Sequence, residues 1–371
     1  MNAIGRFTSS LCAALFSLCI LLSSPLAARV HEVSIGSVNI TREVRGLNGA
    51  WGFGFLPDGS MIITEKRGRL FLYKEGERMR RISGLPEIKV QGQGGLLDVA
   101  PARDFETSSE IFLTFAGALE EGIGTSVAVA KLNTNSLMLE DLRVIYKMTK
   151  GARGGTHFGS RVVEAPDGTL FVSIGDRGDR PSAQDLSRSN GSIIRINRDG
   201  SIPEDNPFLD QDAPEIWSYG HRNPQGMDIS NSGDLWAVEH GPKGGDELNL
   251  IVQGQNYGWP VISYGTHYSG ATVGEGTSKL GMVQPEHFWD PSMAPSGLMI
   301  YEGDMFPEWR GDIFIGSLKF DYISRLSGDQ KTEVEQIKTM DTLRVRDVRE
   351  GPDGSIWFIS EDRSAIYKIS R

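Results

Sequence analysis

Cysteine is almost absent from this chain of 371 residues. Its two copies, Cys12 and Cys19, both lie near the N-terminus, in a segment that we expect to be removed. The mature chain would then hold no thiol at all. Disulfides, cysteine nucleophiles, iron–sulfur clusters and thiolate metal sites are excluded for such a chain.

The N-terminus has the pattern of a secretion signal. Arg6 supplies the positive charge, residues 11–22 form an apolar stretch, and the small residues at 23–28 resemble a cleavage region. We therefore predict a signal peptide over residues 1–28 and a single mature domain over residues 29–371. A periplasmic or secreted location follows, and it suits a protein without thiols.

Positive charge, long apolar runs and helical patterns are also scarce. The 38 Lys and Arg against 48 Asp and Glu give a formal net charge of −10, which makes the chain a poor partner for nucleic acid. After the signal, no run approaches the roughly 20 apolar residues that span a bilayer, so we expect no stable membrane insertion. The six histidines include no pair with the spacing of a helical zinc site, so a histidine-based metal centre is not expected.

Glycine, by contrast, is abundant, with 45 copies, and one pattern recurs six times. Each copy is a turn rich in Asp, Gly or Ser followed by a short run of β-branched and aromatic residues. Further strand-like runs flank most copies, for example residues 51–55 before the first copy and 69–73 after it. Repeats of this size, with three or four strands each, indicate the blades of a β-propeller. The six runs begin at Met61, Ile111, Leu170, Leu235, Ile313 and Ile356.

We therefore predict an all-β fold, a six-bladed β-propeller of four-stranded antiparallel blades. A large β-sandwich, or two smaller β domains, is the alternative. A strand over Glu32–Ile40 would complete the last blade and close the ring. Residues 203–214 and 266–284 have the composition of polar loop insertions, and long loops of a propeller gather on one face and carry function.

Two polar runs stand on either side of a predicted hairpin. HRNPQG occupies residues 221–226 and EHGPKGGDELN occupies 239–249, with strand, turn and strand over 227–238. A tight hairpin would bring both runs to the same end of a sheet. There a guanidinium, two amides, two carboxylates and a rigid Gly-Pro backbone would converge, which we interpret as a binding site.

His157 lies among glycines just before a predicted strand, and Asp176 ends the next strand of the same blade. Adjacent antiparallel strands could bring this carboxylate against the imidazole. Such a pair fixes the tautomer and raises the basicity of the ring, as a general base requires. The alternative is a histidine that is simply hydrogen-bonded in a loop.

Gly241-Pro242, followed by Asp246 and Glu247, suggests a calcium site. Calcium takes hard oxygen ligands, including backbone carbonyls, and Gly and Pro can turn carbonyls toward one point. The carboxylates are fewer than in a high-affinity loop, so another ligand would have to complete the shell. A turn with two solvated acids is the alternative.

Basic residues gather late in the chain, at Lys319, Arg344 and Arg346. Alternation along a strand would place the two arginines on one face, where they repel unless an anion lies between them. Together with Arg222 they would suit a poly-carboxylate ligand, because Arg matches carboxylates bidentately. A solvated strand face is the alternative.

Taken together, these runs resemble the soluble quinoprotein glucose/sorbosone dehydrogenase family, and the aldose sugar dehydrogenases of the bacterial periplasm in particular. The resemblance extends from Trp51 to the C-terminus, and HRNPQG followed by EHGPKGGDELN is its most specific part. It implies a six-bladed propeller that binds pyrroloquinoline quinone (PQQ) and Ca2+. It also implies oxidation of aldose sugars at C1 to lactones, with electrons passed on to an external acceptor.

The resemblance further implies roles for the residues singled out above. His157 would be the general base for the C1 hydroxyl, while hydride moves to C5 of the quinone, and Asp176 would orient it. Arg222, Asn223 and Gln225 would contact cofactor and substrate.

The other implied contacts concern the cofactor, the sugar and two calcium ions. Lys319, Arg344 and Arg346 would hold the carboxylates and quinone oxygens of PQQ. The remaining contacts are Gln93 near the sugar, the carbonyls of Gly241 and Pro242 at a calcium that polarises the quinone, and Glu247 and Tyr257 at a second, structural calcium.

The sequence departs from the glucose-specific relatives at two places. Thr156 stands where those relatives have an acidic residue before the catalytic histidine, and the loops over 263–284 and around Trp289 are shorter. A broad range of aldoses and a monomer are therefore expected. Two other functions stay open on the residues alone: a calcium-dependent sugar lactonase, and a non-catalytic propeller that binds a glycan or a protein.

Overall fold

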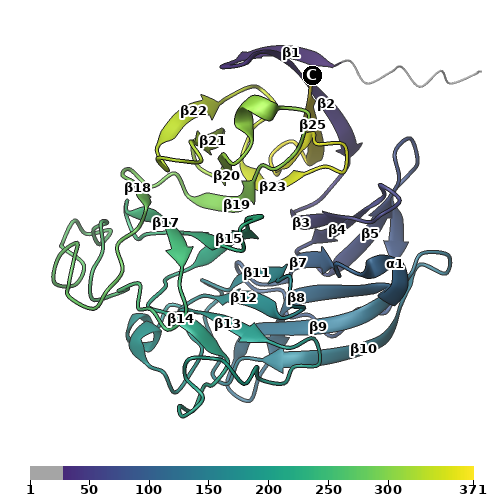
Figure 1. The fold of residues 1–371 in the computed structure, drawn as a ribbon. Coiled ribbons are helices and arrows are strands. Elements are labelled where there is room, and N and C mark those ends of the chain that lie inside the picture. Colours follow the sequence, from purple (N-terminus) through teal and green to yellow (C-terminus); the bar gives the residue numbers. More distant parts are fainter. Residues whose placement is uncertain (1–27) are drawn as a thin grey trace, which may run out of the picture.

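The computed structural model describes residues 28–371, which form six antiparallel β-sheets arranged in a ring (Figure 1). The predicted six-bladed β-propeller is confirmed. The predicted signal peptide, apart from its last residue, lies outside the described residues. No helix within residues 28–371 is long and apolar enough to cross a membrane.

The innermost strand of each blade is the one that begins its run of consecutive antiparallel strands; in the sixth blade this is β23, because β1 and β2 join that blade from outside. Neighbouring innermost strands contact one another around the axis, in the order β3, β7, β11, β15, β19, β23 and back to β3. The first blade contains β3 (Ala50–Phe55), β4 (Met61–Glu65), β5 (Arg69–Tyr73) and β6 (Arg80–Ile82). The second contains β7 (Leu96–Pro101), β8 (Glu110–Ala118), β9 (Ile123–Asn133) and β10 (Met138–Lys147). The third contains β11 (Gly159–Glu164), β12 (Leu170–Ile174), β13 (Ser192–Ile196) and β14 (Ile216–Tyr219).

The remaining blades follow the same plan. The fourth contains β15 (Pro224–Ile229), β16 (Leu235–Glu239), β17 (Asp246–Ile251) and β18 (His287–Trp289). The fifth contains β19 (Pro295–Ile300), β20 (Ile313–Ser317), β21 (Ile323–Leu326) and β22 (Glu333–Ile337). The sixth contains β23 (Val345–Glu350), β24 (Ile356–Ser360) and β25 (Ala365–Ser370), with β2 (Gly36–Arg45) and β1 (Arg29–Val33) on its outside. Helical structure in the described chain is limited to α1 (Phe105–Ser108) and the 3-10 turns η1 (Arg180–Gln184) and η2 (Pro307–Trp309).

The six repeated runs of the sequence are the second strands of the six blades. Blades pack face to face, so five of these strands, β4, β12, β16, β20 and β24, are buried along their whole length. Their apolar side chains form the cores between neighbouring blades. Each fully buried Ile or Leu contributes about 1.5–3 kcal/mol relative to an exposed one, which is why these runs are apolar without alternation.

The turn before a second strand is held by its own aspartate. The Oδ1 atom of Asp167 accepts hydrogen bonds from the backbone N–H of Thr169 at 2.9 Å and from its hydroxyl at 2.7 Å. Gly168 between them has a φ of 83°, which a glycine adopts without strain. The recurring Asp-Gly-Ser/Thr sequence is therefore a turn that starts the second strand of a blade.

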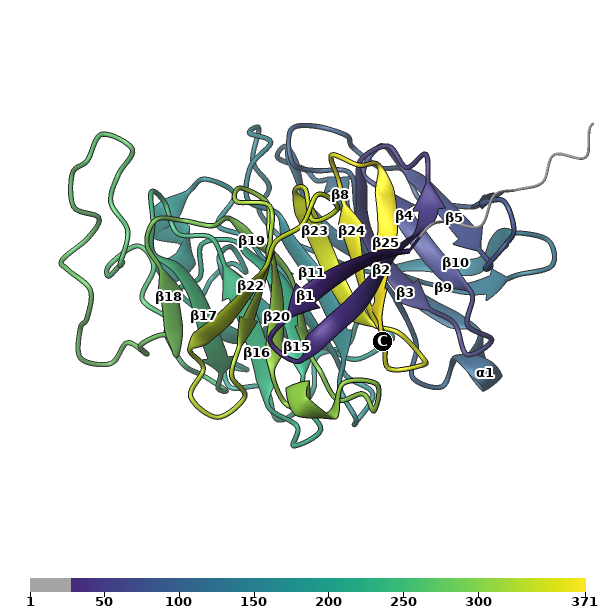
Figure 2. The ribbon, with the colours of Figure 1, turned by 90° about the horizontal axis from the view of Figure 1, so that it is seen from above.

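The N-terminal segment closes the ring, as predicted, but as two strands instead of one. β2 pairs with β25 of the last blade, and a turn at residues 34–35 folds β1 back onto β2 (Figure 2). The single strand expected over Glu32–Ile40 was therefore wrong in its bounds. The sixth blade has five strands, whereas the prediction gave four to every blade. The insertions at 203–214 and 266–284 contain no strand, as expected.

Candidate functional site

The candidate site lies at one end of the propeller axis, where the innermost strands begin. The loop residues just before these strands meet there with the residues just after the second strands, because the two strands are antiparallel neighbours. Two adjoining cavities of about 380 and 490 Å³ occupy this end and share Gln93, His240, Ala294 and Lys319 in their walls. A ligand at the site therefore contacts several blades at once.

His157 and Asp176 form the pair that the sequence predicted. His157 precedes β11, Asp176 follows β12, and the imidazole Nδ1 lies 2.6 Å from the carboxylate Oδ1. Asp176 is fully buried, whereas the His157 side chain is 16% exposed and lines the larger cavity. Burial alone would raise the pKa of Asp176, but the hydrogen bond and charge of His157, with the N–H groups of Gly178 and Trp259, lower it below its usual value.

The backbone at His157 has a φ of 51°, a left-handed conformation that costs a non-glycine residue some energy. Gln93 holds it: its side-chain Oε1 accepts a hydrogen bond from the backbone N–H of His157 at 2.7 Å. Arg177 donates to the carbonyl of Gly154 in the same loop at 2.8 Å. Gln93, predicted to lie near the sugar, therefore lines both cavities and also fixes the loop that carries His157.

The hairpin of β15 and β16 brings the two polar runs together, as predicted. Pro224 pairs with Glu239 across the strands, and the backbone N–H of Arg222 donates to Glu239 at 2.6 Å. The Arg222 guanidinium donates to the carbonyl of His240 at 3.2 Å, while its buried Nε has no partner within residues 28–371. Asn223 accepts a hydrogen bond from the backbone N–H of Gly159 at 3.0 Å, so its amide also braces the His157 loop.

Lys319, Arg344 and Arg346 all line the smaller cavity, but the arrangement of the two arginines was predicted wrongly. Arg344 is not on a strand face: it precedes β23 and has a φ of 49°. The anion between the arginines is a residue of the chain itself, Glu361, whose carboxylate lies 3.0 Å from Arg344 and 3.2 Å from Arg346. Glu361 comes directly after β24, the second strand of its blade, much as Asp176 comes soon after β12. Sequence reasoning missed it.

His240 is a second residue that sequence reasoning left without a role. It follows β16 and lines both cavities. Burial and the positive charges of Arg222 and Arg346 lower its pKa to about 3, so its imidazole is neutral. Its position directly after a second strand, which it shares with Glu361 and Lys66, is the signal that could have identified it.

The loop predicted to bind calcium separates its two acids. Asp246 is fully buried and is occupied by hydrogen bonds from Ser292, Ala294 and the backbone N–H of Gly241. It therefore does not converge with Glu247 on one ion, because neighbouring strand residues point to opposite faces. Within residues 28–371 no three His, Cys, Asp or Glu side chains gather as a group that could hold a metal ion.

Glu247 instead faces Glu239, its partner across β16 and β17. Both carboxylates share the side-chain amide of Asn249, at 3.4 and 3.3 Å. Burial and the neighbouring charge of Glu239 raise the pKa of Glu247 well above its usual value. Both acids line one small cavity together with Tyr257.

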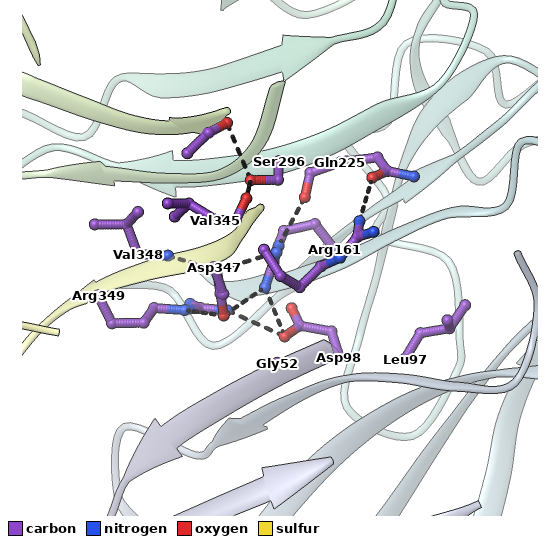
Figure 3. A network of polar contacts seen from close by, with 12 residues as sticks. Gly52, Leu97, Asp98, Arg161, Gln225, Ser296, Val345, Asp347, Val348 and Arg349 are labelled. Atoms are coloured by element: carbon purple, nitrogen blue, oxygen red, sulfur yellow. Dashed lines mark hydrogen bonds and ion pairs between the residues drawn. The ribbon is translucent and has the colours of Figure 1, made fainter. Parts of the chain in front are cut away.

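Four charged side chains of the innermost strands β7, β11 and β23 form an ion network (Figure 3). Arg161 bridges Asp98 and Asp347 at 2.8 and 3.1 Å, and Arg349 bridges the same two carboxylates at 3.0 and 3.1 Å. Two cations thus balance two anions. A lactonase would need calcium held by several carboxylates in this pore, but here the carboxylates are neutralised by arginines.

This axial ion network, Asp98, Arg161, Asp347 and Arg349, also supports the floor of the smaller cavity. The Arg161 Nε donates to the backbone carbonyl of Gln225 at 3.0 Å, and Gln225 Oε1 accepts from Arg346 at 3.0 Å. Gln225 therefore connects the network to the cavity through its backbone and its side chain.

Comparison with known proteins places this geometry in a family. The family model described as "Glucose / Sorbosone dehydrogenase" matches residues 47–368. The aldose sugar dehydrogenase YliI of Escherichia coli (strain K12) is 39% identical over 345 residues, which are 90% of this chain and 93% of that protein.

Solved structures agree. The soluble aldose sugar dehydrogenase from Escherichia coli, in its apo form, superposes with a TM-score of 0.86 at 39% identity, covering 90% of this chain and 99% of that one. The PQQ-bound aldose sugar dehydrogenase from Streptomyces coelicolor shares the fold, with a TM-score of 0.76 at 22% identity over 93% and 99% of the two chains. This chain therefore belongs to the glucose/sorbosone dehydrogenase family and is an oxidoreductase.

Proposed function

We propose that this protein oxidises aldose sugars at C1 to lactones, with PQQ as the electron-accepting cofactor and calcium as a Lewis acid. The observation that carries the proposal is the His157–Asp176 pair at 2.6 Å, facing a cavity that is lined by Arg222 and Lys319 and adjoins the arginines at 344 and 346. A base and a cluster of cations in one cavity suit removal of a proton beside an anionic cofactor.

The residues present fit PQQ. This cofactor is a tricarboxylate, and the cavities offer it Lys319, Arg344, Arg346 and the buried, unpartnered Nε of Arg222. Glu361 neutralises part of this charge, which keeps the two arginines in place without a ligand. When bound, PQQ supplies a quinone carbonyl that takes up the hydride from C1 of the sugar.

The base would act through a defined nitrogen. Because the lowered pKa of Asp176 keeps it ionised, the facing Nδ1 of His157 carries a proton. The Nε2 atom is then free to accept the proton of the C1 hydroxyl. Asp176 stabilises the imidazolium that forms, and the C1–O bond becomes the carbonyl of the lactone as the two electrons leave with the hydride.

Free backbone oxygens support the proposed calcium sites. The carbonyls of Gly241 and Pro242, at the larger cavity, accept no hydrogen bond from residues 28–371. A carboxylate of PQQ would complete the coordination there, and calcium would polarise the quinone. For the second ion we propose Glu247 and Tyr257, joined by Glu239, whose negative charge next to Glu247 a cation would compensate.

Tyr257 would contribute its carbonyl to this second site. Its hydroxyl is already engaged, donating to the carbonyl of Leu250 at 2.5 Å and accepting from the N–H of Val252 at 2.9 Å. The Tyr257 carbonyl accepts no hydrogen bond from the part of the chain that the structure describes.

The remaining features of the proposal concern the setting of the enzyme. We place the mature protein, residues 29–371, in the periplasm or outside the cell, because its N-terminus has a signal pattern. We propose a monomer because the loops over 263–284 and around Trp289 are shorter than in the glucose-specific relatives. Electrons must leave the reduced cofactor, so an external acceptor is part of the cycle.

The test is reconstitution. The mature chain is produced without PQQ, PQQ and calcium are added, and reduction of a dye is followed with several aldoses. We expect reduction that requires PQQ, calcium and sugar together. His157→Ala should lose roughly 10²-fold or more of the turnover while still binding the quinone, as judged from its absorbance.

His31→Ala is the matched control, because His31 lies on the outermost strand β1, far from the base in the ring. It should turn over like the parent. Absence of PQQ-dependent dye reduction with every aldose tested would refute the dehydrogenase proposal, and turnover that survives His157→Ala would refute the choice of base.

A further inference from the structure

Trp259 stands behind the His157–Asp176 pair. It lies in the loop between β17 and β18, and its ring is buried, with 5% of the residue exposed. Its backbone is fixed on both sides: its N–H donates to the carbonyl of Gly220 at 2.8 Å, and its carbonyl accepts from the Gln184 side chain at 2.8 Å. The indole therefore has a defined position.

The indole continues the hydrogen-bond line that begins at His157. Its Nε1–H donates to Oδ2 of Asp176 at 2.8 Å. The other oxygen, Oδ1, faces His157 at 2.6 Å and accepts from the backbone N–H of Gly178 at 2.8 Å. One carboxylate oxygen thus faces the base and the other faces the indole, so the carboxylate cannot rotate without losing a bond on each side.

Two cations lie over the indole ring. The guanidinium carbons of Arg180 and Arg222 are 5.5 and 5.4 Å from its centroid. A cation at a ring face attracts electron density from the ring, which makes the N–H a stronger donor. Arg222 also lines the larger cavity, so Trp259 contacts both a cation of that cavity, Arg222, and the carboxylate that pairs with His157, Asp176.

We propose that Trp259 is a positioning residue that sets the orientation of Asp176 and, through it, the proton affinity of His157. This inference rests on the proposed function, in which His157 is the base. Donation from the indole spreads the negative charge of the carboxylate away from Oδ1. Without that donation Oδ1 becomes more basic and holds the imidazolium more strongly, so His157 would keep its proton to higher pH.

Other charged groups also act on the pair, and the test must hold them constant. Arg177 is the next residue after Asp176, Arg222 and Arg180 lie beside the indole, and His240 lies close enough for the charge of His157 to act on it. Of the titratable or charged groups around the pair, Arg177 follows Asp176 in the chain and Arg180 lies over the indole. The others line the same cavity as His157: Arg222, His240, Lys243, Tyr268, Asp290 and Lys319.

Trp259→Phe removes the N–H and keeps an aromatic ring. Trp217→Phe is the matched control, because Trp217 on β14 also has a guanidinium over its ring, that of Arg195 at 5.0 Å, but makes no contact with the pair. Both variants are first checked for a parent-like circular dichroism spectrum. If Trp259→Phe does not fold, benzothienylalanine at position 259 replaces the N–H by sulfur in a ring of the same shape.

The first readout is an NMR titration of the His157 imidazole in the protein without PQQ, with the resonance assigned from its loss in His157→Asn. We expect the midpoint to move upward by about half a pH unit in Trp259→Phe and to stay in place in Trp217→Phe. An unchanged midpoint in the folded Trp259 variant overturns the inference, whatever the activity of the enzyme.

The second readout is the pH profile of the PQQ-loaded enzyme. The midpoint of the acid limb should move to higher pH, as in the titration. The value of kcat should fall roughly tenfold, because a base that is held less well loses part of its contribution, and KM should change little. A fall in kcat with an unmoved acid limb would mean a purely structural role and would also overturn the inference. If His157→Ala retains turnover, the choice of base fails, while the titration still tests the link from Trp259 to His157.

Discussion

Removing the charge of Asp98 from the axial ion network should destabilise the whole propeller. Asp98 is fully buried and accepts hydrogen bonds from Arg161 at 2.8 Å, from Arg349 at 3.0 Å and from the backbone N–H of Val162 at 3.0 Å. Asp98→Asn keeps the size of the side chain but leaves two guanidinium groups with one carboxylate, that of Asp347. The axis then holds a buried charge without a counter-ion.

The magnitude follows from this imbalance. Breaking a buried ion pair by removing one partner costs about 3–5 kcal/mol. The unfolding entropy of globular proteins is about 2.1 cal/mol/K per residue, hence roughly 0.7 kcal/mol/K for a chain of this length. The midpoint of thermal unfolding should therefore fall by about 4–7 °C.

Two comparisons make the assay specific. Asp141→Asn removes an exposed partner of Lys131, whose Nζ lies 3.0 Å away, and a surface pair contributes about 0–1 kcal/mol, so its midpoint should fall by no more than about 1 °C. The double variant Asp98→Asn/Arg349→Gln restores the charge balance, leaving Arg161 paired with Asp347, and should recover part of the loss.

Differential scanning calorimetry of five proteins, these four and the single variant Arg349→Gln, without PQQ or calcium, checks these values. The reasoning is refuted if Asp98→Asn melts within about 1 °C of the parent, like the surface variant. It is also refuted if the double variant loses as much as its two single variants added together, because the network would then have no coupling energy.

Three further outcomes are expected. Excess chelator should lower the thermal midpoint of the calcium-loaded protein, because calcium binds the folded state, and should have little effect on Glu247→Gln; an unchanged midpoint in the parent would count against the second calcium site. The pKa of Asp176 in the folded protein lies below its value in the unfolded chain, so its contribution to stability is complete above roughly pH 4 and is lost as the pH falls through the folded pKa. Urea midpoints measured between pH 2 and 5 should therefore decline less steeply with falling pH in Asp176→Asn than in the parent. Equal slopes would contradict this. Thr156→Asp, which introduces the acidic residue that we expect in glucose-specific relatives, should raise kcat/KM for glucose relative to other aldoses, and an unaltered ratio would exclude a role of this position in selectivity.

The interactions predicted correctly from the sequence are local ones. The six second strands could be located because each is a buried apolar run after a turn, and the turn at Asp167-Gly168-Thr169 is built by hydrogen bonds within three residues. The pairing of His157 with Asp176 followed from antiparallel strands that are neighbours in the sequence. The meeting of HRNPQG with EHGPKGGDELN followed from one hairpin.

Contacts between blades were decided by the closed ring alone. Arg161 and Asp347 are 186 positions apart in the chain, and only the circular order of the blades brings them together. Glu361 was missed for a related reason: its place between Arg344 and Arg346 depends on a positive φ at Arg344, which the alternation of a regular strand does not foresee.

The sequence by itself therefore determined the number of blades, the second strand of each blade and the pairing of His157 with Asp176. The tertiary structure decided which charges neutralise one another, how Trp259 meets Asp176 across 83 positions, and that Asp246 accepts hydrogen bonds from Gly241 and Ala294. The physical reason is that hydrogen bonds within a blade depend on local spacing, whereas electrostatic contacts at the axis depend on how six separately formed sheets are oriented once β2 closes the ring.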